Sequence, residues 1–174
     1  MKRVFAGLLC VCLLLLVGCG QPKEYPPYYP HSDTLRLDAS AEEILAATEM
    51  KPVKEGMKFY EAIEPILWDG LKYSMTMVSD EDNAPRVYYV TRSTESDLSE
   101  VHAAWKKHFS EIYGKPSKAN DSEVFMQCDV WKFQIDTGDQ YTIGLVQDYY
   151  TNTEPKKYLV QIDVNKSKQE NSTD

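Results

Sequence analysis

The chain lacks the concentrated positive charge that nucleic-acid binding requires. Its 174 residues carry 19 Lys and Arg against 27 Asp and Glu, a formal charge of −8, and no stretch is rich in Lys or Arg. A polyanion is bound through a basic face that displaces its counterions, so the composition excludes a generic nucleic-acid-binding protein. Hydrophobic residues at 43% and aromatic residues at 11% also exclude a globally disordered chain.

Residue patterns typical of enzymes and metal sites are scarce. The sequence holds three histidines, His31, His102 and His108. The last two are separated by about 240° on a predicted helix, so they do not form the i, i+4 pair that chelates zinc. There is no glycine-rich phosphate loop, nucleophile elbow or Ser-His-Asp set. We therefore expect a non-enzymatic protein with no catalytic residue, metal or cofactor.

One tripeptide, Asp136-Thr137-Gly138, matches the catalytic tripeptide of aspartic proteases, whose mechanism needs two such carboxylates. The similarity stops at three residues, because Asp139 follows and the chain has no second copy. A protease would therefore require a homodimer. The tripeptide lies between two predicted strands, which indicates a hairpin turn.

A second cluster, Asp80-Glu81-Asp82-Asn83, gathers oxygen atoms that suit Ca²⁺. An EF-hand loop counted from Asp80 would need Gly and Glu at its sixth and twelfth positions, where this chain has Pro85 and Thr91. We interpret the cluster as a solvated turn and keep Asp80, Glu81 and Asp82 as candidate contacts for a partner.

The N-terminus has the pattern of an export signal. Lys2–Arg3 precede an almost unbroken apolar run, Val4–Val17, which is too short to cross a bilayer comfortably. The run ends in Leu16-Val17-Gly18-Cys19, which resembles the lipobox of bacterial lipoproteins. The resemblance implies cleavage after Gly18 and a lipid, with acyl chains such as palmitate, on Cys19.

This resemblance also implies a location. Several acyl chains anchor a domain to a membrane essentially permanently, without a spanning helix. Gly20 is not the Asp that signals inner-membrane retention. We therefore expect the outer membrane, facing the periplasm, in a Gram-negative cell, and otherwise the outer face of the plasma membrane.

Processing leaves few cysteines and a strongly acidic chain. Cys10 and Cys12 leave with the signal and Cys19 takes the lipid, so Cys128 remains alone and no intramolecular disulfide forms. Apolar neighbours suggest that Cys128 is a small buried side chain. The mature chain has 17 basic and 27 acidic residues, a charge of −10, which favours a cationic partner.

The composition divides the chain into four segments. Residues 1–18 form the signal peptide, and 19–32, rich in Pro and Tyr, form an extended tether that begins at the lipidated cysteine. Residues 33–164 form one globular domain, and 165–174, which lack apolar residues, form a disordered tail.

Hydrophobic periodicity predicts two helices and six strands in that domain. Ser40 and Glu43 form a capping box for a helix to about Glu49, and a second helix starts after Ser96 as N-cap and ends before Gly114. Strands are predicted at 58–68, 71–79, 86–92, 129–136, 141–147 and 157–164, with Asp69-Gly70 as a tight hairpin turn and Pro65 weakening the first strand.

Apolar residues alternate along the last three strands, so one face of the sheet is buried and the other is wet. We predict an α+β two-layer sandwich, an antiparallel sheet with helices on one face. Its order, helix then three strands twice, suggests an αβββ-αβββ duplication, although no residue-level match supports one.

Exposed tyrosines are the remaining candidates for a binding surface. In the pairs Tyr88/Tyr89 and Tyr149/Tyr150, one ring lies on each side of the sheet, and an exposed ring can anchor a protein interface or stack on a sugar. We expect a lipid-anchored, non-enzymatic envelope protein that contacts another envelope component. The alternatives are a small-ligand or glycan-binding module, and an inhibitor or immunity protein against a cationic toxin or a muralytic enzyme.

Overall fold

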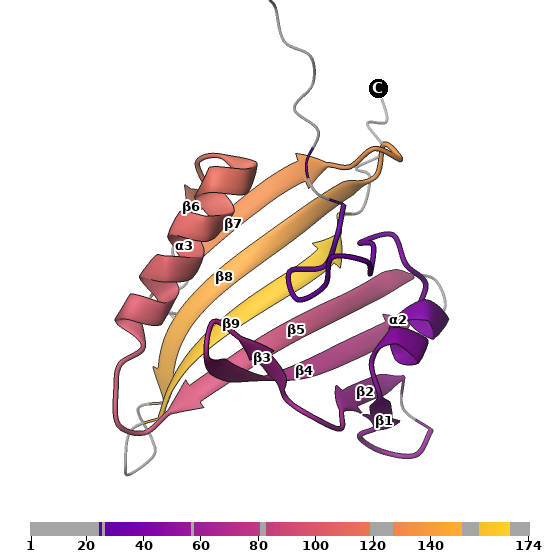
Figure 1. Cartoon of the computed structure of the whole chain (residues 1–174), viewed down its shortest axis with the longest axis horizontal. Helices are drawn as coiled ribbons and strands as arrows, with labels where there is room; N and C mark the ends of the chain where they lie inside the picture. Colours follow the sequence, from indigo (N-terminus) through magenta and orange to yellow (C-terminus); the bar gives the residue numbers. More distant parts are fainter. Residues whose placement is uncertain are drawn as a thin grey trace, which may run out of the picture.

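A computed structural model describes residues 25, 27–56, 58–80, 83–118, 127–150 and 157–167. Within these ranges the chain forms two helices and nine strands (Figure 1). In chain order they are α2 (Ala41–Ala47), β1 (Met50–Pro52), β2 (Phe59–Ala62), β3 (Ile66–Trp68), β4 (Leu71–Asp80), β5 (Asn83–Ser93), α3 (Ser99–Tyr113), β6 (Ser117–Lys118), β7 (Gln127–Gln134), β8 (Gln140–Tyr150) and β9 (Lys157–Lys166).

The strands form one antiparallel sheet in the order β1-β2-β4-β5-β9-β8-β7-β6, and β3 pairs with β4 beside β2. The last strand of each half of the chain, β5 and β9, meet at the centre. This pairing joins the two halves into a single sheet. The structure therefore confirms the predicted α+β class with an antiparallel sheet.

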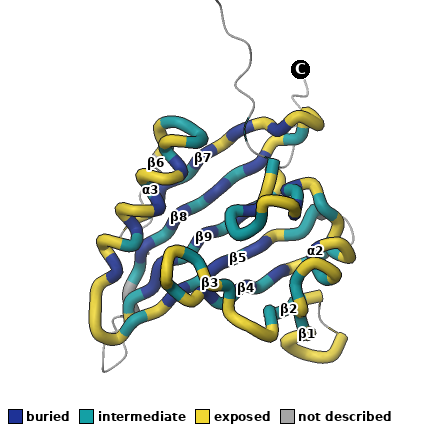
Figure 2. The backbone as a smooth tube through the Cα atoms, in the orientation of Figure 1, coloured by how far each residue is buried: buried dark blue, intermediate teal, exposed yellow. Residues whose placement is uncertain are grey.

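The two faces of the sheet differ in burial, as the alternation predicted. Figure 2 shows buried and less buried residues alternating along β5, β9 and β8. The covered face supplies most of the hydrophobic core. The core includes Tyr89, Trp131 and Ile143 of the sheet, Ile44 of α2 and Phe109 of α3. Figure 1 shows both helices in front of the same face. The opposite face carries residues such as Gly144, Gln161 and Asp163, which are only half-buried.

Local signals in the sequence fix several of these elements. The Ser40 hydroxyl accepts a hydrogen bond from the Glu43 N–H and the Glu43 carboxylate accepts one from the Ser40 N–H, which confirms the capping box. Asp69 and Gly70 both have positive φ, 49° and 75°, as a tight two-residue hairpin turn requires. The predicted strand 58–68 is interrupted before Pro65, which leaves β2 and β3 as separate short strands.

The start of α3 differs from the prediction. Its N-cap is Leu98, in the left-handed region at φ 57°, and not Ser96. Ser93 accepts hydrogen bonds from the N–H groups of Glu95 and Ser96, which forms a separate turn before the helix. The Asp97 carboxylate accepts a bond from the Ser99 N–H instead. The buried side chain of Leu98 lies in the core at this point.

The predicted tether is wrong over most of its described part. Tyr25 packs against Tyr113 and Phe133, and Tyr29 is only 2% exposed. Residues 27–39, which we call the strap, fold back on themselves: the Tyr29 N–H donates to the Leu35 carbonyl and the Leu37 N–H to the Pro27 carbonyl. The globular domain therefore begins by Tyr25, because aromatic burial outweighs the extended preference of this Pro-rich segment.

The C-terminal boundary of the domain lies later in the chain than predicted. β9 continues through Asn165 to Lys166, and the Ser167 N–H donates to the Gln140 carbonyl, so residues 165–167 are part of the sheet or bonded to it. The rest of the predicted tail, 168–174, lies outside the described residues, as does the segment 1–24. No helix in the described part of the chain combines the length and apolar character needed to cross a membrane.

Candidate functional site

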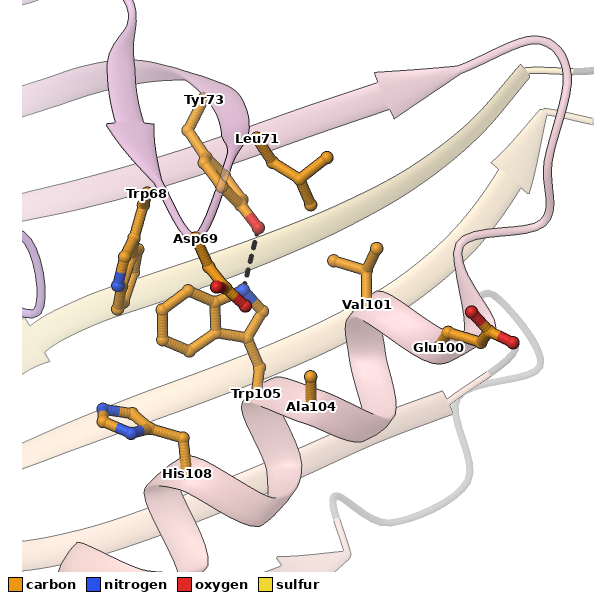
Figure 3. A pocket seen from close by; sticks show the side chains of 9 residues that line it. All are labelled: Trp68, Asp69, Leu71, Tyr73, Glu100, Val101, Ala104, Trp105 and His108. Atoms are coloured by element: carbon orange, nitrogen blue, oxygen red, sulfur yellow. Dashed lines mark hydrogen bonds between the residues drawn. The ribbon is translucent and has the colours of Figure 1, made fainter.

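A cleft on the covered side lies between the β3–β4 hairpin and α3 (Figure 3). It has a volume of about 560 Å³. We call it the Trp cleft. Its lining comprises Trp68, Asp69, Leu71, Tyr73, Glu100, Val101, Ala104, Trp105 and His108.

Aromatic rings form the floor and one wall of the Trp cleft. The Trp105 indole N–H donates a 2.8 Å hydrogen bond to the buried Tyr73 hydroxyl. Trp68 contacts the Trp105 ring, and His108 meets Trp105 edge-on at 82°. Burial raises the pKa of Tyr73, so its hydroxyl stays protonated at neutral pH. These rings fix one another in place, which gives the cleft a preformed surface.

The two walls come from separate local structures. On one side, the Asp69-Gly70 turn places Trp68 opposite Leu71 as a cross-strand pair. On the other, Val101, Ala104, Trp105 and His108 recur at three- and four-residue spacing along α3, so they share one face of the helix. The cleft therefore depends on the hairpin and the helix being docked on the same sheet.

The charged side chains of the Trp cleft are acidic. Asp69 and Glu100 lie in it and are exposed, and its lining includes no Lys or Arg. In the view of Figure 3 the Asp69 carboxylate projects in front of the Trp105 ring, whereas the Glu100 carboxylate points away from it. The two acids do not converge on one point, which is what paired general acid and base catalysis would need. The arrangement suits binding.

A buried polar cluster lies on the other side of α3. Asp129 of β7 accepts a 2.8 Å hydrogen bond from the Lys106 ammonium and one of 3.1 Å from the Gln127 amide. His102 is buried, and its Nε2 lies 3.5 Å from Asp129 without forming a hydrogen bond. Burial lowers the pKa of His102, although Asp129 opposes this shift. The ring also bonds the Leu145 backbone.

This cluster holds the helix on the sheet. A catalytic histidine needs a ring nitrogen that can reach a substrate, but His102 is closed in among Asp129, Lys106 and Leu145. No group of three or more His, Cys, Asp or Glu that would hold a metal ion occurs among the described residues.

The Asp136-Thr137-Gly138 tripeptide forms the predicted turn between β7 and β8. Gly138 has φ 87°, and the Ile135 N–H donates to the Asp139 carbonyl to close the turn. Arg36 of the strap donates to both oxygens of the Asp136 carboxylate, at 2.7 and 3.3 Å, and holds its pKa below the usual range. Asp136 thus joins the strap to the sheet.

The other predicted contact residues lie far from the Trp cleft or outside the description. Tyr88 is half-buried on the uncovered face, where Arg86 lies over its ring and pairs with Asp163 at 2.8 Å. Tyr89 is fully buried, so this pair divides between the two faces as predicted. Asp80 is the last residue of β4, and Tyr149 and Tyr150 are the last two residues of β8; the side chains of these three residues are not described. Glu81, Asp82 and Cys19 lie outside the described residues.

Cys128 is half-buried and unpaired, although we expected a buried side chain. Its position explains the difference, because it pairs with Val146 at Cα level on the uncovered face, while Asp129 takes the buried side. Burial and nearby Asp129 and Asp163 raise the pKa of the Cys128 thiol. It is therefore a weak nucleophile.

A second cavity, of about 440 Å³, lies between the strap, the end of α2 and the segment before β3. His31 borders it and forms a 2.7 Å hydrogen bond with the Tyr89 hydroxyl. Glu49 and Glu64 supply its charge, and no Trp or Tyr ring lines it. It offers a ligand fewer contacts than the Trp cleft.

The sequence did not identify the Trp cleft. Trp68 falls at the end of the predicted strand 58–68 and Trp105 within the second predicted helix, and neither position by itself indicates a cavity. The one available signal was Trp68 beside the Asp69-Gly70 turn, since a large ring next to a tight turn lies near the end of a hairpin. Comparison with known proteins adds no candidate: no family model, no curated protein and no solved structure matches the chain.

Proposed function

We propose that this chain is a lipid-anchored, non-enzymatic protein of the bacterial cell envelope that binds another envelope component through the Trp cleft. The observation that carries the proposal is a preformed cavity lined by Trp68, Tyr73, Trp105 and His108 with two exposed acids beside it. Aromatic and apolar lining with a few polar groups is typical of binding sites. The Leu16-Val17-Gly18-Cys19 tetrapeptide supports lipidation at Cys19 and export.

Location and binding are separable in one experiment. We would express the wild-type chain, Cys19→Ser, Trp68→Ala and Leu67→Ala in the native cell, crosslink intact cells and recover the protein from membrane and soluble fractions. Leu67 neighbours Trp68 on β3, is 70% exposed and lies outside the Trp cleft, so it is the matched control.

Cys19→Ser should lose lipid labelling and leave the membrane fraction. Trp68→Ala should remain on the membrane but lose the crosslinked component, which Leu67→Ala should retain. Full membrane retention of Cys19→Ser would refute the anchor, and an unchanged crosslinking pattern in Trp68→Ala would refute the role of the cleft.

A small-ligand or glycan-binding module is the second candidate. The half-buried Trp68 ring favours it, because an accessible indole stacks well on a sugar ring. Recovery of wall glycan, lost in Trp68→Ala and kept in Leu67→Ala, would support this candidate over a protein partner.

We also infer that the domain is a two-layer sandwich built from a duplicated αβββ unit. The order β2-β4-β5 followed by β9-β8-β7 supports this, because corresponding strands of the two halves lie at corresponding distances from the centre. The first half has the short α2 and the second the long α3 before its strands.

A further inference from the structure

We propose that the Trp cleft takes a Lys or Arg side chain from a polypeptide partner. This inference rests on the proposed function and names the chemistry of the ligand. The cation would lie against the half-buried Trp68 indole, close to the carboxylate of Asp69, with Glu100 at the rim of the cleft.

The lining of the cleft selects for positive charge. Aromatic faces attract a cation within about 6 Å of the ring centroid, and Trp is the best of them. Asp69 and Glu100 add two negative charges, and no Lys or Arg in the lining neutralises them. Both attractions favour a cationic group over a neutral one.

The polar groups fit a neutral sugar less well. Sugar hydroxyls need both donors and acceptors, whereas the carboxylates of Asp69 and Glu100 are acceptors only. The donor of Trp105 is already used, because it bonds the Tyr73 hydroxyl at 2.8 Å. The other ring donors of the lining are the Trp68 indole N–H and the His108 imidazole. An ammonium or guanidinium group, which donates and does not accept, satisfies these carboxylates.

The shape favours a side chain that projects from a larger partner. Asp69, Glu100, Ala104 and His108 are exposed, so the rim of the cleft is open. The volume of about 560 Å³ accommodates a long side chain together with part of the backbone that carries it. An open rim does not enclose a free small molecule, which would keep much of its surface in water.

The net charge of the chain acts in the same direction. At −8 for the whole sequence, it attracts a basic partner over a distance of about a Debye length and repels an acidic one. Charge attraction brings the partner close, and the Trp cleft then takes up one cationic side chain.

The test is titration of the full-length chain, purified in neutral detergent micelles, with two short peptides. One alternates Gly and Lys, and the other alternates Gly and Gln. Tryptophan fluorescence reports the binding, because two of the three Trp residues line the cleft and the third, Trp131, is buried in the core.

The Lys peptide should bind and the Gln peptide should not. Asp69→Asn and Glu100→Gln should each weaken binding about threefold, and Trp68→Ala roughly threefold to tenfold. Asn tolerates the positive φ of position 69, so the hairpin turn is kept. Glu42→Gln is the matched control, since Glu42 is exposed in the first turn of α2, away from the cleft. Raising the salt concentration should weaken binding as well.

Three results would overturn the inference. The first is no binding of the Lys peptide. The second is equal weakening by Glu42→Gln, which would indicate attraction to the whole acidic surface. The third is binding of both peptides that is lost in Trp68→Ala but unaffected by salt and by the charge variants. This third result would leave the proposed function standing, because the cleft would still bind. Crosslinking that is unchanged in Trp68→Ala would instead remove the proposed function itself.

Discussion

Helix α3 and the strap cover the same face of the sheet by different means. The helix satisfies its own backbone hydrogen bonds and places a buried face of His102, Trp105 and Phe109 on the sheet. The strap has few internal backbone hydrogen bonds and is held by three separate buried side chains, Tyr29, Leu35 and Leu37. The helix is therefore held by many contacts along its length, whereas the irregular strap depends on a few buried side chains.

The largest expected effect is on the helix. Trp105→Ala removes a side chain that is 6% exposed and takes away the donor bonded to Tyr73. We expect a loss of about 3–5 kcal/mol in the free energy of unfolding. Urea unfolding followed by circular dichroism would measure it. A smaller loss of unfolding free energy than that of Tyr29→Ala in the strap would contradict the greater role assigned to the helix.

The strap should respond differently to the loss of its anchors. Tyr29→Ala should cost roughly 3 kcal/mol, and adding Leu37→Ala should cost less than the sum of the single changes, because the strap detaches as a unit. In the double variant, amide hydrogen exchange should show that the backbone N–H groups at positions 29 and 37 lose protection while those of β8 and β9 keep theirs. Additive losses with uniform loss of protection would show that the strap and the sheet unfold together.

The ion pairs of helix α3 and of the strap should also differ in their contribution to stability. Lys106→Met leaves the buried Asp129 carboxylate without its cation, and we expect a loss of about 2 kcal/mol. Arg36→Met breaks the pairs with Asp38 and Asp136, whose side chains are 25% and 54% exposed, and should change the urea midpoint less than Lys106→Met does. Equal effects of the two substitutions would show that burial does not distinguish them.

The pH response of the strap should be smaller than the effect of Lys106→Met. Burial lowers the pKa of His31 to about 4, so the folded chain keeps this ring neutral. The unfolded ring takes up a proton below about pH 6.5, so its contribution to stability is complete above that pH and is lost as the pH falls toward 4.

The matched variant is His31→Gln, which can still bond the Tyr89 hydroxyl. The stability difference between wild type and variant should shift by about 1–2 kcal/mol from pH 7 to pH 4.5, to the disadvantage of the wild type. Urea midpoints at both pH values measure this shift, and a difference that is independent of pH would rule out a buried neutral ring.

The sequence was sufficient where a pattern is local. The Ser40–Glu43 capping box, the Asp69-Gly70 turn and the alternation along β7, β8 and β9 each involve neighbours in the chain, and all are confirmed. The strap was missed because the local preference of its Pro residues is for extended backbone. Only the three-dimensional core shows that Tyr29 has a place to be buried.

The Trp cleft could not be predicted for a similar reason. Trp68 and Trp105 are far apart in the chain, and their contact depends on how a hairpin and a helix dock on one sheet. Periodicity shows that Trp105 is on the apolar side of its helix, but it does not distinguish full burial from the wall of a cavity. The same limit applies to Asp129, whose burial is explained only by Lys106 across the interface.

If Cys19 carries the proposed lipid anchor, the packing of Tyr25 limits how far the domain can move from the membrane. With the proposed anchor at Cys19, six peptide steps separate the lipidated residue from Tyr25, and a fully extended chain of that length spans only about 20 Å. That distance is shorter than strand β8, whose 11 residues extend about 36 Å. The end that carries Tyr25, Tyr113 and Phe133 would therefore stay beside the bilayer, and a binding partner would have to approach within the same thin layer above the lipid headgroups.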